Sequence, residues 1–343
     1  MNTRMVMLQN EACSLSFDRQ GGAWVDFHRK PGGMNPLNFH LEQDVPGAQS
    51  YSFRGHFLCL GRWGDPSPGE AAKGHVKHGD FNRLEWTAEA NGNGCVMRAE
   101  SPLEGLFLER TITLDRQAPL VTVKELVHNT GSLGRLYQMV QHPTLTAPFL
   151  AGDTLVDCNA TTGFDYAFET YDEAAFCQWP VARTTRGEQL HLGRPERPYS
   201  SVFSFIVDPA EEWGWITAYA PAQQLLLGYV WPRIHYPWIH HWLHFEQDTL
   251  RYRGLEFGTT GVHKSFQEIW ERQLLQVLGT PACSYIDSGE TQQRQYSAFQ
   301  LPVPAGFTGV QRVEVGENAL HIVEKGSGTK NTLLFHQPLY DGI

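Results

Sequence analysis

The sequence predicts a mainly β protein built as one large β-sandwich. Short runs rich in β-branched and aromatic residues recur along the 343 residues, separated by Gly, Pro, Asn and Asp, and amphipathic helical periodicity is scarce. A hydrophobic content of 41% is enough to bury a large core. No Ser/Gly/Pro-rich hinge, repeat or charge block divides the chain, so one large domain fits better than two small ones.

The clearest predicted element is a hairpin of strands at residues 110–114 and 120–127, because both segments alternate and the residues between them favour a turn. A further strand is expected at residues 135–141. The remaining expected strands lie at residues 201–207, 213–219, 225–230, 251–257, 270–277 and 296–301. Long binding loops are expected at residues 47–79 and 152–198.

The C-terminal residues are expected to form an appendage. The segment Pro302-Val303-Pro304-Ala305-Gly306 interrupts the chain, and short strands are expected after it at residues 311–315 and 319–323. We therefore predict a sandwich domain over residues 1–302 and a β extension over residues 303–343, to which the sequence assigns no role.

Charge and hydropathy exclude several classes of partner. The formal net charge is −10, and no long run of Lys and Arg offers a surface to nucleic acid or anionic lipid. The N-terminus turns polar before an apolar segment of signal-peptide length develops, and no 18-residue apolar run follows. The six cysteines are irregularly spaced, as expected of reduced thiols. We expect a cytoplasmic protein without nucleic-acid or membrane partners.

One predicted strand carries a carboxylate between glycines. Side chains alternate along a strand, so Tyr252, Gly254, Glu256 and Gly258 share one face. Glycine inside a strand loses packing and costs entropy, so the pair around Glu256 indicates that a ligand or another backbone approaches closely there. An exposed edge-strand glutamate beside two bends is the alternative.

Two histidines complement this carboxylate. His78-Gly79 is expected to form a turn that leads into a strand ending near Trp86. Pro143 biases His142 toward an extended backbone, so His142 is expected at the end of a strand. Each histidine, taken alone, also fits a purely structural role.

Four landmarks follow one another between residues 10 and 300: His78-Gly79 ahead of Arg83 and Trp86, Val127-His128-Asn129 ahead of His142, the strand with Glu256, and the turn Ser288-Gly289-Glu290. In this order they resemble the galactose mutarotase (aldose 1-epimerase) superfamily. The resemblance implies a large antiparallel β-supersandwich and a sugar substrate. It also implies Glu256 as the base, His142 as the acid and His78 as a ligand of a hydroxyl or the ring oxygen, without cofactor or metal. Free and phosphorylated aldoses both fit.

Aromatic and basic residues are candidates for the rest of a sugar site. Indoles stack on the C–H faces of sugars, and the candidate tryptophans are Trp63, Trp86, Trp231, Trp238 and Trp242. Arg62, Arg83 and Asp65 lie near the first landmark and could bind hydroxyls, although an ion pair within the loop explains Arg62 and Asp65 equally well.

The histidines between His235 and His244 invite a metal hypothesis. The segment alternates like a strand, however, and places Trp238, His240, Trp242 and His244 on one face and His241 on the other. No ligand-spaced carboxylate accompanies them. We expect no bound metal and assign the face with Trp238 and His240 to the wall of a sugar cleft.

The leading interpretation is a cofactor-independent epimerase that interconverts anomers of an aldose by acid–base catalysis with Glu256 and His142. A non-catalytic carbohydrate-binding protein of the same fold is one alternative, and it would not depend on these two residues. A glycan lyase or hydrolase is another, and a hydrolase would require a second carboxylate.

Overall fold

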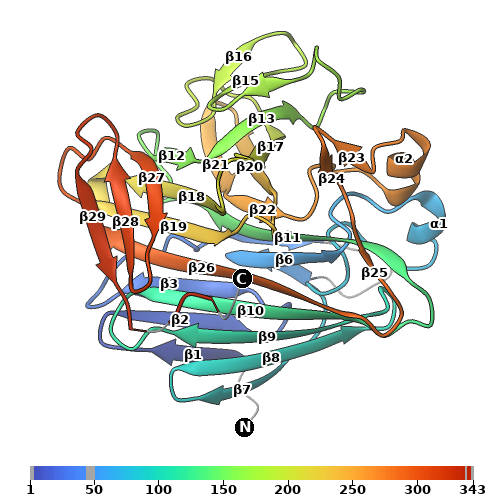
Figure 1. The fold of residues 1–343 in the computed structure, drawn as a ribbon, viewed down its shortest axis with the longest axis horizontal. Coiled ribbons are helices and arrows are strands. Elements are labelled where there is room, and N and C mark those ends of the chain that lie inside the picture. The colour runs from blue at the N-terminus through green and yellow to red at the C-terminus, as the bar shows by residue number, and fades with distance from the viewer. Residues whose placement is uncertain (1–3, 44–50, 337, 341–343) are drawn as a thin grey trace.

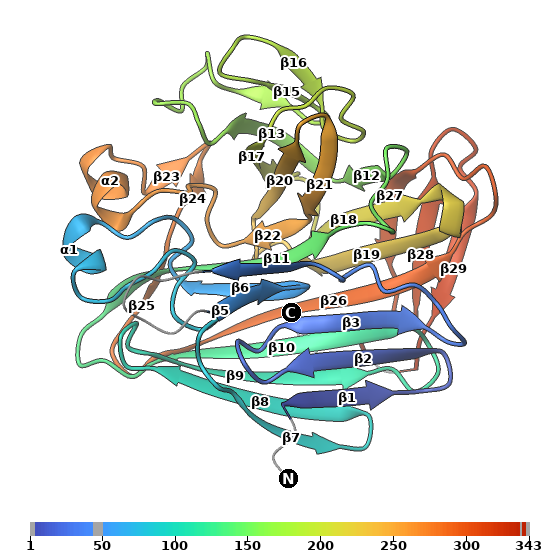
Figure 2. The same ribbon diagram turned by 180° about the vertical axis from the view of Figure 1, so that it is seen from behind.

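The computed structural model describes residues 4–43, 51–336 and 338–340. Two antiparallel sheets face each other in this part of the chain (Figures 1 and 2). The larger, 14-stranded sheet runs in the order β1 (Met5–Gln9), β2 (Cys13–Asp18), β3 (Trp24–Arg29), β6 (His56–Gly61), β11 (Arg135–Leu145), β21 (Thr249–Gly254), β20 (Trp238–Glu246), β17 (Ser201–Val207), β13 (Ala160–Asp165), β14 (Cys177–Gln178), β15 (Val181–Arg183) and β16 (Gln189–His191), with β22 (Glu256–Gly258) and β25 (Ser284–Ile286) paired to β11.

The smaller sheet has eight strands within the described residues, in the order β12 (Leu155–Cys158), β18 (Trp213–Ala220), β19 (Leu225–Pro232), β26 (Thr291–Pro302), β10 (Leu120–Asn129), β9 (Leu106–Leu114), β8 (Gly94–Ser101) and β7 (Thr87–Asn91). The main core lies between the sheets because alternate residues of each strand face inward. Leu15 and Phe17 of β2 and Val121 and Val123 of β10 belong to it. The predicted mainly β antiparallel fold and the hairpin β9–β10 are confirmed.

A three-stranded sheet follows the sandwich, formed by β27 (Val310–Val315), β28 (Ala319–Glu324) and β29 (Lys330–Leu334). It covers the outer face of the smaller sheet (Figure 1). Ile322 and Leu333 pack in one cluster with Trp215 of β18 and Phe299 of β26. The segment after residue 302 therefore shares a core with the sandwich.

Parts of the local structure differ from the sequence predictions. Where a strand is expected at residues 270–277, helix α2 (Phe266–Glu271) ends, a turn follows, and only β23 (Gln276–Val277), paired with β24 (Thr280–Pro281), is a strand. The helix starts with a capping box of Ser265 and Glu268. The segment 47–79, where a long loop is expected, contains β5 (Tyr51–Arg54), β6 and helix α1 (Pro68–Ala71). Strand β5 pairs with β4 (His40–Gln43). Residues 47–50 lie outside the described part. All six residues of β6 are buried, so the strand shows no polar alternation.

The loop expected at residues 152–198 is likewise interrupted by strands, from β12 to β16. A short 3₁₀ helix, η1 (Pro221–Gln223), links β18 to β19. All six cysteines are free. In the described part of the chain, no helix is long and apolar enough to cross a membrane.

Candidate active site

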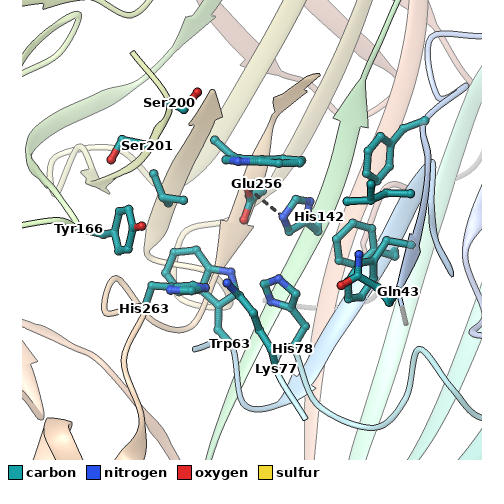
Figure 3. A pocket seen from close by; sticks show the side chains of 16 residues that line it. Gln43, Trp63, Lys77, His78, His142, Tyr166, Ser200, Ser201, Glu256 and His263 are labelled. Atoms are coloured by element: carbon teal, nitrogen blue, oxygen red, sulfur yellow. Dashed lines mark ion pairs between the residues drawn. The ribbon is translucent and has the colours of Figure 1, made fainter. Parts of the chain in front are cut away.

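His142, Glu256 and His78 line one cavity of about 290 Å³, although they are far apart in the sequence (Figure 3). The cavity lies on the face of the larger sheet that points away from the main core. On β6, for example, Leu58 and Leu60 belong to the main core, whereas Phe57 faces the cavity. Strand alternation therefore separates a packed face from a face that is open to a ligand.

The strand register brings the acid–base candidates side by side. β11 pairs with β22 in a register that joins Val140 to Gly258 and Gln141 to Phe257, so the next pair along the ladder is His142 and Glu256. On its other side, β22 joins β20, where His240 pairs with Glu256. The carboxyl group thus projects from the middle of the sheet, from a strand of only three residues.

The glycines around Glu256 make room for protein atoms. A Cβ at Gly254 would collide with Oε1 of Glu256 and would lie 3.0 Å from Cβ of Trp242. A Cβ at Gly258 would lie 2.8 Å from the carbonyl oxygen of Met139 on β11. The close approach that the sequence predicts is therefore to the carboxyl group itself at Gly254 and to the neighbouring strand at Gly258.

His142 is held by contacts at both ring nitrogens. Its Nε2 lies 3.1 Å from Oε1 of Glu256, and its Nδ1 lies 3.0 Å from the hydroxyl of Thr144. That hydroxyl donates to the carbonyl of His142 at 3.4 Å, so it is free to accept a hydrogen bond from Nδ1–H. The network assigns the neutral tautomer whose Nε2 lone pair faces Glu256. Phe57 stacks on the imidazole at 4.1 Å between ring centroids.

Burial determines the protonation of this pair. Desolvation raises the pKa of Glu256 well above its usual value, against the weaker influence of the Trp63 side chain and the positive charge of Lys77. Desolvation also lowers the pKa of His142 to about 3. Neither carboxyl oxygen has a well-aligned hydrogen-bond donor among the described residues. Desolvation thus favours the neutral form of both side chains, a protonated Glu256 beside a neutral His142 imidazole.

His78 enters the cavity from a turn with a left-handed backbone, at φ 66°. Its ring packs against Phe53 at 5.3 Å between centroids, and its buried Nδ1 has no hydrogen-bond partner among the described residues. Desolvation lowers its pKa well below the usual value. A neutral imidazole with an unpartnered nitrogen suits a sugar hydroxyl. The turn at His78 is as predicted, but the strand expected after it is reduced to one bridge between Gln20 and Glu85.

A scan of protein-family models finds no match, and neither does a search of curated proteins. Solved structures do resemble the chain. The galactose mutarotase related enzyme from Lactobacillus acidophilus matches with a TM-score of 0.61 at 9% identity, over 88% of this chain and 99% of that one. The galactose mutarotase-like protein from Lactobacillus casei ATCC 334 matches with a TM-score of 0.55 at 10% identity, over 86% and 99%. The chain has a galactose mutarotase-like fold. The Slr1438 protein from Synechocystis sp. PCC 6803 also matches, with a TM-score of 0.60 at 13% identity, over 87% of this chain and 96% of that one.

Within this galactose mutarotase-like fold, Arg62 and Arg83 do not line the cavity. Arg62 is buried and bonds to Glu104 and Glu70, at 3.2 and 3.0 Å. Arg83 pairs with Asp80 three residues earlier. Both arginines fix the segment that carries His78, and Asp65 lies 4.0 Å from Lys77.

Trp238 and His240 also lie behind the cavity wall. The indole N–H of Trp238 donates to the carbonyl of Pro281 at 2.8 Å, and the side chain is fully buried. His240 bonds through Nδ1 to Ser204 and packs against Trp63 at 4.2 Å between centroids, with the two rings tilted by 36°. His240 thus supports Trp63, which does line the cavity.

Other lining residues complete the cavity. Trp63 and Trp242 line it, whereas the other candidate tryptophans, Trp86 and Trp231, are buried in the main core. Sequence reasoning missed Lys77, Tyr166 and His263. Lys77 precedes His78 in the same turn, and His263 follows the glutamate strand closely, so proximity to both landmarks was the available signal. Aromatic, aliphatic and polar side chains form the rest: Phe39, Leu41, Gln43, Phe53, Phe57, Ser200, Ser201 and Val202.

The histidine-rich strand β20 divides its imidazoles between two faces. His240 contacts Trp63, whereas His241 stacks on Trp179 at 4.5 Å between centroids. Among the described residues, no group of three or more His, Cys, Asp or Glu side chains has the arrangement of a metal site.

Proposed function

We propose that the protein is a cofactor-independent sugar epimerase that interconverts the anomers of an aldose. The observation that carries this proposal is the 3.1 Å contact between His142 and Glu256 at the cavity surface. Two neighbouring groups that hold one proton between them can give a proton at one sugar oxygen and take one at another. The mutarotase-like fold supports the same substrate class.

The reaction needs one acid and one base. A base removes the proton of the C1 hydroxyl while an acid protonates the ring oxygen. The bond between C1 and the ring oxygen then breaks, the C1–C2 bond of the open aldehyde rotates, and the ring closes again. Each proton transfer contributes about 10²–10⁴-fold when a positioned side chain performs it.

The effect of burial on the two pKa values bears on the roles of Glu256 and His142. The resemblance assigns the base to Glu256 and the acid to His142, whereas burial favours the proton on Glu256 and the free lone pair on His142. Transfer of that proton across the contact produces the other arrangement without changing the net charge. The pair can therefore serve both directions of a reversible reaction.

The cavity suits a ring with apolar faces and a polar edge. Trp63 and Trp242 offer indole faces, and His78 and Lys77 offer polar groups at the rim. Its volume of about 290 Å³ lies at the lower end of small-molecule sites, which span about 300–1,000 Å³, as expected for one sugar ring.

The alternatives predict different residues. A hydrolase needs two carboxyl groups across the scissile bond, and Glu256 is the single carboxylate among the described lining residues. A binding protein would need the aromatic wall but no protonated carboxyl group in contact with an imidazole. The contact therefore favours the epimerase.

The test is anomer equilibration, followed by polarimetry or NMR, across free and phosphorylated aldoses. We expect at least one sugar to equilibrate faster with the protein than in buffer, at the same rate with and without EDTA. A panel in which sugars bind but none is accelerated would contradict the proposal.

A further inference from the structure

We propose that the candidate active site continues into a second sugar subsite, so that the preferred substrate is a disaccharide whose reducing-end ring occupies the first cavity. This proposal rests on the epimerase function for the first cavity. A second cavity of about 430 Å³ adjoins the first, and Tyr166, Ser200 and Ser201 line both. Figure 3 shows these three residues together on one side of the first cavity.

The size of the second cavity fits a whole sugar ring. Its volume of about 430 Å³ lies within the range of small-molecule sites, about 300–1,000 Å³. A single ring bound at His142 and Glu256 would leave it empty. A glycosidic substituent on that ring can pass the shared wall and place a second ring beside Arg186 and Gln247, which line the second cavity.

A buried carboxyl group organises the shared wall. Asp165 at the end of β13 is fully buried and accepts hydrogen bonds from the hydroxyl of Ser201, from the hydroxyl of Tyr199 at 2.7 Å and from the backbone N–H of Ala167 at 3.0 Å. Ser201 lines both cavities and Tyr199 lines the second. Asp165 thus fixes Ser201, at the passage between the cavities, and Tyr199 in the second cavity.

The polar groups of the second cavity suit sugar hydroxyls. The guanidinium of Arg186 lies over the ring of Tyr199, 5.9 Å from its centroid. No ion pair joins Arg186 to a carboxylate of the described residues, so its N–H groups can donate to a ligand. The Tyr199 hydroxyl also contacts that of Thr185 at 3.2 Å, and the amide of Gln247 adds a donor and an acceptor. Such mixed donors and acceptors match a ring of hydroxyl groups.

A phosphate fits the second cavity less well. Phosphate sites combine several charge-assisted donors, often with a helix N-terminus. The described residues of this cavity include one cation, Arg186, among hydroxyl and amide groups. We therefore commit to a second sugar ring and treat a phosphate as the competing outcome.

The test compares three ligands built on the aldose that the protein equilibrates fastest: the free aldose, disaccharides with that aldose at the reducing end, and its 6-phosphate. We expect kcat/KM to be at least tenfold higher for one disaccharide than for the free aldose. Arg186→Ala should lower the value for that disaccharide about tenfold, as for a lost hydrogen bond to a charged group, and leave the free aldose within about twofold. Arg183→Ala is the matched control, because Arg183 lies on the adjacent strand β15 and lines neither cavity.

Equal kcat/KM values for the free aldose and all disaccharides would overturn the proposal. An equal loss of kcat/KM for the free aldose and the disaccharide in Arg186→Ala would also overturn it. The same holds for a preference for the 6-phosphate that Arg186→Ala abolishes and Arg183→Ala does not. If no sugar is turned over, calorimetric affinities for the same sugars separate the two ideas. Tighter disaccharide binding that Arg186→Ala selectively weakens would uphold the second subsite while the epimerase proposal fails, and equal affinities would overturn the subsite.

Discussion

At the residue scale, the candidate site depends on a carboxyl group placed where its charged form is least stable. Glu256 is fully buried, and desolvation is the main reason that its pKa is raised. Burying such a group destabilises the folded chain at neutral pH. The raised pKa also keeps a proton on the group, where it is available for transfer.

The effect of Glu256 on stability has a definite sign. Between the unfolded pKa of 4.5 and the higher folded pKa, the folded chain binds more protons than the unfolded chain, so stability falls as pH rises through this window. Glu256→Gln removes the titration. We expect a higher Tm than wild type at pH 8 and no difference at pH 4 or below. Thermal unfolding across pH tests this, with the exposed Glu317→Gln as the control. A difference in Tm between Glu256→Gln and wild type that does not change with pH would contradict this expectation.

Some site residues could be predicted from the sequence and others could not. His78, His142 and Glu256 stand in landmarks whose order identified them. Arg62 and Trp63 are neighbours, yet only Trp63 lines the cavity, because adjacent side chains point in different directions. That direction depends on partners far away in the sequence, such as Glu104 for Arg62, which no local pattern reveals.

At the element scale, a break between two strands positions the carboxyl group. β21 ends at Gly254 and β22 begins at Glu256, while the N–H of Leu255 donates to the carbonyl of Pro143 on β11 at 2.8 Å. The sequence predicts one continuous strand here. It could not show the break, because the alternating pattern runs through Leu255 without interruption and both β21 and β22 pair with the same two neighbours, β11 and β20.

Gly254→Ala tests whether this element aims the carboxyl group. The added methyl group would occupy the position of Oε1 of Glu256, so the carboxyl group must move. We expect kcat to fall about 10²-fold, the loss that a misplacement of about 1 Å can cause. Gly69→Ala in α1 is the matched control, because its Cβ would meet no heavy atom within 4 Å. Equal activity of both variants would show that the position of the carboxyl group does not matter.

At the scale of the whole molecule, hydrogen bonds between the two sheets support the strands that carry the site. Gln141, next to His142, donates to Glu125 of the smaller sheet at 2.7 Å, and Glu125 accepts from Arg110 at 2.8 Å. His56, next to Phe57, contacts Gln141 at 3.1 Å. All four side chains are buried between the sheets. The sandwich thus fixes β6 and β11 relative to each other, so that the cavity face is largely formed before a ligand arrives.

The sequence predicted the class of this architecture but missed its central strand. Apolar and polar residues alternate in segments such as β9 and β10, and this pattern predicts a sheet with one packed face. β6 lies between β3 and β11 and is buried on both faces, so it shows no polar alternation and the sequence pattern predicts a loop there.

Turnover of Glu256→Gln and His142→Asn, measured together with sugar affinity, tests the central claim most directly. Glu256→Gln keeps the size of the side chain and much of its hydrogen bonding, whereas His142→Asn replaces the imidazole with a smaller amide, and each variant removes one member of the proton-transfer pair. We predict that kcat falls about 10²–10⁴-fold in each variant while the affinity for the sugar changes little. If a sugar binds to the wild-type protein but equilibrates no faster with it than with Glu256→Gln, the protein is not an epimerase of that sugar and the binding-protein interpretation replaces the proposal.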